Sequence, residues 1–434
     1  MAQTESMDVP EEFLDALVEV LDVVRDDHAR TRPDVGRLTK LGRGVVAQRV
    51  SQLLAFGLLA EDTMAASTGG RPARSLRFRA EAGVVIAVEL GASSVAVGLA
   101  DLRGGLLDYR EEPADIGDGP EAVLERVEAL ADELLEGRPA GAPPVWGVGV
   151  GLPGPVEYRR GRPMSPPIMP GWDGYPVRER LAARFGAPTW VDNDVNLMAV
   201  GEYRAGRAQG EPDVVFIKIG TGIGAGLISR GLPHRGAQGA AGDVGHIAVV
   251  DDPTAVCRCG KIGCLEAVAG GAALARFATE LAESGDSPYL ARLLKKKGAL
   301  SAEDLGEAAS HGDVRAVELF ERTATYIGRM LATMINFFNP SLVIIGGGVA
   351  QLGDQFLAAV RQSVYSRSLP LATRDLKIVL TGASDRIGLV GAAYTVIDEL
   401  FSRDCLSRWL GSGSPAGHPD LTDDAPAIAD ATAV

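Results

Sequence analysis

The sequence predicts an α/β body behind a small, mainly helical N-terminal module, and two observations lead to this. Residues 25–79 contain eleven Lys or Arg and five Asp or Glu, about +6, although the whole 434-residue chain has a formal charge of −14. From Gly83 onward, apolar segments interrupted by glycine alternate with helical patterns, which is typical of α/β folds. A basic module is therefore joined to an acidic body, and the length allows two or three compact domains.

Three short helices are expected in the module. Apolar residues over 13–24 recur at the spacing that gives a helix one buried face. A second helix is expected around 33–38, and a third over about 43–56, after a turn that ends at Gly42. This order is typical of helix-turn-helix domains, in which one helix enters the major groove of DNA.

The third helix would direct a set of polar side chains away from the apolar core. Arg43, Gln48, Arg49 and Ser51 lie opposite its apolar residues in the helical repeat. Such donors reach base edges and phosphates when a helix lies in the major groove. We therefore predict that Arg43, Gln48 and Arg49 contact DNA.

Two short strands, 57–61 and 75–79, are expected after the third helix, and the loop between them contains Gly69, Gly70 and Arg71. This pattern predicts a winged helix-turn-helix. An arginine on a flexible wing is well suited to a narrow A·T minor groove, so Arg71 is the candidate contact. The alternative is a packing or dimerisation module whose basic face is only solvated.

Glycine-rich turns between apolar strands are the main feature of the body. The segment 220–226 follows a predicted strand and would expose backbone N–H groups, as a phosphate or sugar cradle requires. A tight hairpin turn is the alternative. The strands expected in the body are 84–90, 94–99, 145–150, 189–191, 214–219 and 342–345.

Asn193 and Asp194 come where a predicted strand ends and a helix begins. An amide can donate to and accept from a sugar hydroxyl, and a neighbouring carboxylate can take the proton of an attacking hydroxyl. The alternative is that they only cap the helix, since Asn and Asp satisfy free N–H groups at helix starts.

A cluster of metal-binding residue types is the strongest local pattern. His246 is followed by Cys257, Cys259 and Cys264, whereas Cys405 stands alone. One His and three Cys form a closed tetrahedral zinc set, which predicts a structural Zn²⁺ that does not itself activate water. Buried thiols without a metal are the alternative. The ion would hold the cysteine loop against its neighbours, including Asp243 and Glu266.

With these motifs in this order, the sequence resembles the ROK family of bacterial repressors, unassigned reading frames and sugar kinases. The resemblance rests on the glycine loop 220–226, the Cys-x-Cys-Gly-x-x-Gly-Cys-x-Glu run at 257–266, and Asn339-Pro340 before Gly346-Gly347-Gly348. The preceding module with its Gly-Gly-Arg-Pro is similar to that of the repressor branch, because the simple kinases begin near the position of Gly83.

The resemblance implies a two-lobed, actin-like ATPase (sugar-kinase-like) fold with its ligand between the lobes. We expect a winged helix-turn-helix domain at 10–80, a first lobe at 83–199 that takes back a final helix at 386–410, and a second lobe at 200–385. Residues 411–434 lack an apolar period and are expected to be a disordered tail.

The resemblance also implies site roles. Asn193, Asp194, Asp243, His246 and Glu266 would contact the sugar, with Asp194 in the position of the catalytic base. Kinases of the family carry an Asp-x-Gly-Gly-Thr phosphate loop, but this chain has Glu89-Leu90-Gly91-Ala92-Ser93. Because phosphoryl transfer depends on accurate positioning of metal and phosphates, we expect little or no kinase activity.

The function expected is therefore a transcriptional regulator, most simply a repressor, that binds operator DNA and responds to a sugar or sugar phosphate. The runner-up is an ATP-dependent sugar kinase with an accessory DNA-binding module, and a third reading is control by a protein partner. Symmetric operators favour a homodimer or homotetramer. With no 18-residue uncharged apolar run and no secretory signal pattern, a cytoplasmic protein without membrane contact is expected.

Overall fold

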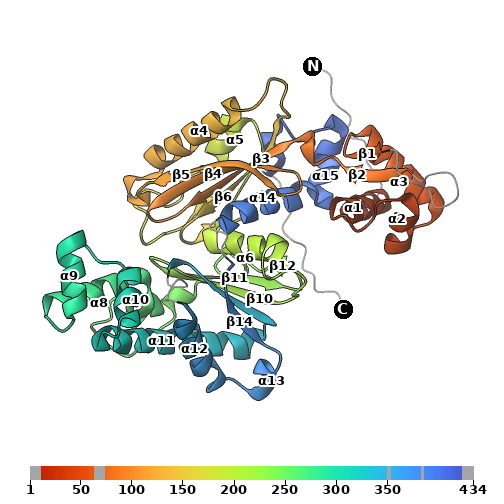
Figure 1. Ribbon diagram of the computed structural model, residues 1–434. Helices are drawn as coiled ribbons and strands as arrows, with labels where there is room; N and C mark the ends of the chain where they lie inside the picture. Colours follow the sequence, from red (N-terminus) through yellow and green to blue (C-terminus); the bar gives the residue numbers. More distant parts are fainter. Residues whose placement is uncertain (1–10, 63–73, 349–352, 383–385, 423–434) are drawn as a thin grey trace.

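The N-terminal module in the computed structural model has the expected three helices and a two-stranded hairpin (Figure 1). The structure describes residues 11–62, 74–348, 353–382 and 386–422. Strands β1 and β2 pair antiparallel, and the loop between them, which carries Arg71, lies outside the described residues. The elements of the module are α1 (Glu11–Arg25), α2 (Arg32–Thr39), α3 (Arg43–Ala55), β1 (Leu59–Asp62) and β2 (Ser75–Phe78).

The first lobe is built on a five-stranded sheet of order β5-β4-β3-β6-β9. Alternate residues of β3 face opposite sides, so Ile86 and Val88 pack under α4 and α5, whereas Val85 and Ala87 face α14. The elements are β3 (Val84–Leu90), β4 (Ser94–Asp101), β5 (Leu106–Pro113), α4 (Pro120–Glu136), β6 (Val145–Leu152), the hairpin β7 (Val156–Glu157) and β8 (Arg162–Pro163), α5 (Val177–Phe185), β9 (Thr189–Asn193) and α14 (Ile387–Leu400).

The second lobe repeats the same topology. Its sheet has the order β12-β11-β10-β13-β14, so each lobe has three consecutive antiparallel strands followed by two parallel strands on the other side of the first. The expected two-lobed α/β architecture is confirmed. The strands are β10 (Val214–Ile219), β11 (Ile223–Ser229), β12 (Leu232–Pro233), β13 (Leu342–Gly346) and β14 (Lys377–Leu380).

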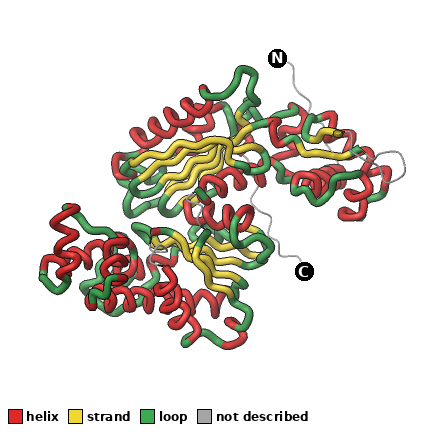
Figure 2. The backbone as a smooth tube through the Cα atoms, in the orientation of Figure 1, coloured by secondary structure: helices red, strands yellow, loops and turns green. Residues whose placement is uncertain are grey.

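Helices α6 (Asp194–Ala205) and α14 lie between the two sheets, which Figure 2 shows as separate yellow layers. Glycines bring their backbones into contact. A Cβ at Gly391 would lie 1.7 Å from the Leu197 carbonyl oxygen, and a Cβ at Gly201 would lie 2.2 Å from that of Ile387. Gly226 of β11 approaches α6 from the other side, where a Cβ would lie 2.5 Å from the Val195 carbonyl oxygen.

The outer face of the second sheet is covered by helices that share one large apolar core. None of the helices in the described ranges is both long and apolar enough to cross a membrane. The helices are α7 (Leu265–Ala269), α8 (Gly271–Glu283), α9 (Pro288–Lys297), α10 (Ala302–Ser310), α11 (Val314–Phe338), α12 (Gly353–Tyr365) and α13 (Pro370–Thr373).

An aromatic cluster joins the N-terminal module to the first lobe. Phe78 of β2 contacts Phe401 edge to face, with 5.7 Å between ring centroids. Phe401 in turn packs on Trp146 of β6 and on Trp409 of α15 (Arg403–Trp409). All four side chains are buried in a core that the module shares with the first lobe. The module is therefore packed against the first lobe and is not a separate domain on a flexible linker.

The expectation of a disordered tail from Gly411 onward is wrong for residues 411–422. These residues form two short turns on the first lobe, in which Leu421 and Thr422 are buried. The Arg408 guanidinium donates to the Leu421 carbonyl oxygen at 2.6 Å. Hydrogen bonds from arginine side chains to backbone carbonyls need no apolar repeat in the sequence. The ordered turns therefore leave no sequence pattern that would predict them. Residues 423–434 lie outside the described residues.

Truncation of Phe401 tests the shared core. Phe401→Ala should lower the free energy of unfolding by about 3–5 kcal/mol, because it removes a fully buried ring and leaves a cavity. Leu232→Ala, which removes a side chain that is 70% exposed, should change it by less than about 0.5 kcal/mol. Urea titration measures both. Equal effects would show that the aromatic cluster does not stabilise the fold.

Candidate ligand cleft and DNA-binding helix

A cavity of about 300 Å³ lies between the lobes. The turn after β3 and the turn after β10 both line it, and because the two sheets share one topology these are equivalent hairpin turns of the two lobes. The predicted sugar-binding residues from distant parts of the chain also meet here. The cavity is lined by Asn193, Asp194, Asp243, His246 and Glu266, together with Gly91–Ser94, Ile168, Lys218, Gly220–Ala225 and Arg258.

Asn193 combines the two roles that the sequence left open. Its Oδ1 accepts from the Val195 N–H at 2.9 Å, so it caps α6, and its Nδ2 donates to the Gly154 carbonyl oxygen at 2.9 Å. It nevertheless lines the cavity. Two backbone groups thus fix the orientation of the amide beside the ligand space.

Asp194 is held by an ion pair that no local sequence pattern predicts. Its Oδ2 lies 2.6 Å from Nζ of Lys218 on β10, and its side chain is only 5% exposed. Burial opposes the charge of Lys218, but the carboxylates of Asp194 and Glu89 outweigh burial and raise its pKa. The Lys218 ammonium therefore balances the charge of the Asp194 carboxylate.

Glu89 does not line the cavity, and its carboxylate lies against the start of α14. A Cβ on Gly388, in the first turn of that helix, would lie 2.2 Å from Glu89 Oε2, and the Leu389 backbone bonds to the carboxylate. Helix starts favour negative charge. Loss of water nevertheless raises the pKa of Glu89 to about 7, although Lys218 opposes this. Glu89, whose side chain is one methylene longer than the Asp of the kinase loop, thus contacts the start of α14. Residues Gly91–Ser94, which follow it in the same loop, line the cavity.

Glu266 and Arg258 form the other end of the cavity. Glu266 Oε2 accepts from the Ile223 N–H at 3.1 Å, and Oε1 lies 3.3 Å from Arg258 Nη2. A Cβ at Gly222 would lie 2.4 Å from Glu266 Oε2, so a larger residue there would displace the carboxylate from its present position. Asp243 lines the cavity at its rim, where its side chain remains 45% exposed.

His246, Cys257, Cys259 and Cys264 come together beside this end. Their candidate ligand atoms all lie within 4.8 Å of one another, and Cys259 Sγ is 3.8 Å from Cys264 Sγ. Two thiolates bound to one tetrahedral metal ion are about 3.8 Å apart, so the spacing fits. Burial raises the pKa of Cys264 to about 12, whereas a coordinated cation favours the thiolate. The cluster could hold a metal ion.

The imidazole of His246 can serve both the metal cluster and the cavity. Nδ1 lies 3.5 Å from Cys257 Sγ, while Nε2 lies on the side of Asp243, 3.8 Å from its Oδ1. An Nδ1 ligand and a thiolate on one tetrahedral ion are about 3.6 Å apart, which agrees with the observed spacing. A metal bound at Nδ1 would therefore leave Nε2 to face the ligand space.

Helix α3 presents a small polar surface to solvent. Arg43, Gln48 and Ser51 are exposed, as expected for a helix that enters a groove. Arg49 is not, because its guanidinium lies 4.0 Å from the ring centroid of Phe13 and donates to Gln52 Oε1 at 3.0 Å. The expected outward direction of Arg49 is corrected accordingly, since a buried cation stacked on α1 is not presented to DNA in this conformation.

The comparisons with known proteins agree with this architecture. The model of the ROK family matches residues 85–399. The chain belongs to the ROK family. It is 31% identical to a glucokinase of Halalkalibacterium halodurans over 72% of this chain and 94% of that protein.

Repressors of the ROK family align with a larger part of the chain. A xylose repressor of Caldicellulosiruptor bescii is 28% identical over 88% of this chain and 95% of its own length. A crystal structure described as a ROK family transcriptional regulator, a homologue of E. coli Mlc, superposes with a TM-score of 0.79 at 26% identity, covering 93% of this chain and all of that one. The regulator match therefore includes most of the N-terminal module.

Glu89 generates a prediction about pH. Its pKa is 4.5 when unfolded and about 7 in the fold, so the native state retains the proton longer and loses stability as pH rises from about 4.5 to 7. An ionised Glu89 costs about 3 kcal/mol above that range. Glu89→Gln should therefore be close to wild type at pH 5 and more stable at pH 8, by up to that amount. Urea titrations at the two pH values measure it, and the same difference at both would contradict the assignment.

Proposed function

We propose that this protein is a transcriptional repressor whose affinity for operator DNA changes when a sugar or sugar phosphate binds between the lobes. The observation that carries the proposal is the extent of the repressor and regulator matches, which cover 88% and 93% of the chain and so reach beyond the ROK body into the N-terminal module. The glucokinase match covers 72% of this chain, about the share taken up by the body.

The DNA-reading element of the proposal is α3. Gln48 and Arg43 on its exposed face would bind base edges and phosphates, and Arg71 of the wing would approach the minor groove. Because operators are commonly symmetric, the repressor would act as a homodimer or homotetramer. A sugar would be bound by Asn193, Asp194, Asp243, His246 and Glu266, which line one cavity with amide, carboxylate and imidazole groups.

Two features favour a binding protein over the alternative, an ATP-dependent sugar kinase. A general base must take a proton, but Asp194 is paired with the Lys218 ammonium. Glu89, which stands where the kinases of the family carry their phosphate-loop Asp, contacts the start of α14 and is not among the residues that line the cavity. A coupled assay with MgATP and glucose or xylose tests the alternative directly, because steady turnover would establish a kinase.

The metal of the Cys and His cluster is proposed to be a structural zinc ion. Three thiolates and one imidazole fill all four positions of a tetrahedral site, so no position remains for a reacting water. When bound, the ion would fix the loop that carries Glu266 and the ring of His246 beside the cavity. The protein residues would still make the sugar contacts.

The zinc proposal predicts about one zinc ion per purified chain. Cys259→Ser should lose the metal and weaken sugar binding, since a thiolate ligand is removed and the loop before Glu266 is released. Cys405→Ser is the matched control, because Cys405 is buried in the core of the first lobe, away from the cluster. Metal analysis and calorimetry measure these effects. Unchelated protein that contains no zinc and binds sugar fully would overturn the assignment.

The proposed function predicts that sugar and DNA binding can be separated. Asp194→Asn and Glu266→Gln should weaken sugar binding and leave operator binding without sugar largely intact. Gln48→Ala should do the reverse and reduce discrimination between selected and scrambled DNA by about 1–3 kcal/mol. Arg71→Ala should lower the salt dependence of binding by roughly one unit of slope.

The measurement begins with in vitro selection of operator sequences, followed by DNA titrations at several salt concentrations. A thermal-shift screen with glucose, xylose and their phosphates identifies the sugar, because a ligand of the native state raises the melting temperature. Arg160→Ala, which removes an exposed cation of the first lobe, serves as the control for DNA binding. Parallel loss of both activities in Asp194→Asn would contradict the assignment of the cleft.

A further inference from the structure

Helix α6 extends from the cavity to the N-terminal module. It begins with Asn193 and Asp194 at the ligand space and ends with Arg204 near α1. Twelve residues of α-helix span about 18 Å. Because α6 packs on β11 of the second sheet and on α14 of the first, movement of one lobe against the other must shift it against at least one of them.

Arg204 is tied to α14 by a two-point ion pair. Its Nη2 and Nε donate to the two carboxylate oxygens of Asp398, at 2.5 and 3.1 Å. Its guanidinium also lies 5.8 Å from the ring centroid of Tyr394, on the same helix. Bidentate arginine–carboxylate pairs are strong and directional. The position of Asp398 is therefore sensitive to the position of the end of α6.

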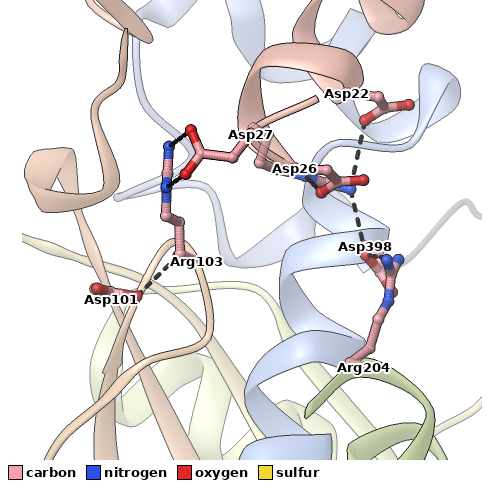
Figure 3. A network of polar contacts seen from close by, with 8 residues as sticks. Asp22, Asp26, Asp27, Asp101, Arg103, Arg204 and Asp398 are labelled. Atoms are coloured by element: carbon pink, nitrogen blue, oxygen red, sulfur yellow. Dashed lines mark hydrogen bonds and ion pairs between the residues drawn. The ribbon is translucent and has the colours of Figure 1, made fainter. Parts of the chain in front are cut away.

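Asp398 is shared with the N-terminal module. Its Oδ1, the atom bound by Arg204 Nη2, also lies 3.6 Å from Nη2 of Arg25, the last residue of α1. Figure 3 shows Asp398 between Arg204 and the acidic residues at the end of α1. The Arg25 side chain is only 9% exposed and is also paired with Asp22 and Asp26. One carboxylate thus bridges the sugar-binding helix and the DNA-binding module.

This polar contact differs from the other attachment of the module. The aromatic cluster around Phe401 is apolar and buried, whereas the seam at Asp398 borders an open cavity of about 440 Å³ with mainly charged and polar walls. A second ion pair crosses the same seam, from Arg103 of the first lobe to Asp27 at 2.9 Å (Figure 3). Because the Asp398 side chain is 34% exposed, its ion pairs can be rearranged at lower cost than a packed aromatic core.

We propose that Asp398 couples the sugar cleft to the DNA-binding module. Closure of the cleft on a ligand would shift α6, change the Arg204–Asp398 geometry and alter the hold of Asp398 on Arg25 at the end of α1. The apolar cluster would act as the fixed pivot. This inference rests on the proposed function and assigns its regulation to named residues: Arg204, Asp398 and Arg25 act as positioning residues and touch neither sugar nor DNA.

The test compares the effect of sugar on operator binding in wild type and Asp398→Asn, using the full chain. The probe is whichever of glucose, xylose and their phosphates raises the melting temperature. Coupling of this kind changes affinity by about 5–150-fold. We expect Asp398→Asn to reduce the wild-type change in operator Kd to less than about 3-fold, with the Kd for sugar alone within about 2-fold of wild type. By linkage, the effect of operator on sugar affinity should fall equally.

Asp15→Asn is the matched control, because Asp15 also lies on α1 but pairs with Arg403 of α15, 3.0 Å away and outside the α6 connection. It should keep the full response. Arg25→Gln approaches Asp398 from the module side, and its combination with Asp398→Asn should be no worse than either change alone. If Asp398→Asn does not bind sugar, the change in operator Kd of Arg25→Gln on addition of sugar tests the coupling instead.

The outcomes separate the two claims. Loss of response in Asp398→Asn or Arg25→Gln, with sugar binding intact, supports the coupling. A full response in both variants overturns the coupling and leaves the proposed function standing. A wild-type protein that binds none of glucose, xylose and their phosphates, or whose operator affinity does not change with the ligand it binds, overturns the proposed function and the coupling with it.

Discussion

The close approach of α6 to its neighbours is the constraint on which the rest of the structure depends. Gly391 and Gly201 allow α6 to touch α14, and Gly226 allows β11 to touch α6 from the other side. A side chain at any of these glycines would push the layers apart, because the obstructing atoms are mainly backbone carbonyls and cannot rotate away. The same contacts place the start of α6 at the cavity and its end at the module.

Much of the fold could be predicted from local patterns. The apolar runs at 84–90 and 214–219 coincide with β3 and β10, and the helix expected at 43–56 matches α3 to within one residue. The repetition of one topology in both lobes was not visible, since the two sheets share an order of strands and no obvious sequence repeat. The turns at 411–422 were missed because arginine–carbonyl bonds leave no periodic signal.

The site was predictable where adjacent residues carry the chemistry, as in the cysteine run that lies close to His246 in the fold. It was not predictable where partners come from different elements. Lys218 sits in an ordinary strand, and only the packing of β10 against α6 brings it to Asp194. Arg49 follows the polar face of α3 in a helical projection, yet its long side chain folds back onto Phe13. Directions of long side chains are decided by neighbours.

The core shared by Phe78, Trp146, Phe401 and Trp409 limits how this protein can be rearranged. A body cut free near Gly83 would expose indole and phenyl rings to water, and an isolated module would lose the surface on which Phe78 packs. If the DNA-binding module were exchanged between regulators of this architecture, α15 and the residues around Trp146 of β6 would therefore have to be exchanged with it. The helix-turn-helix and the C-terminal segment thus belong to one packed unit.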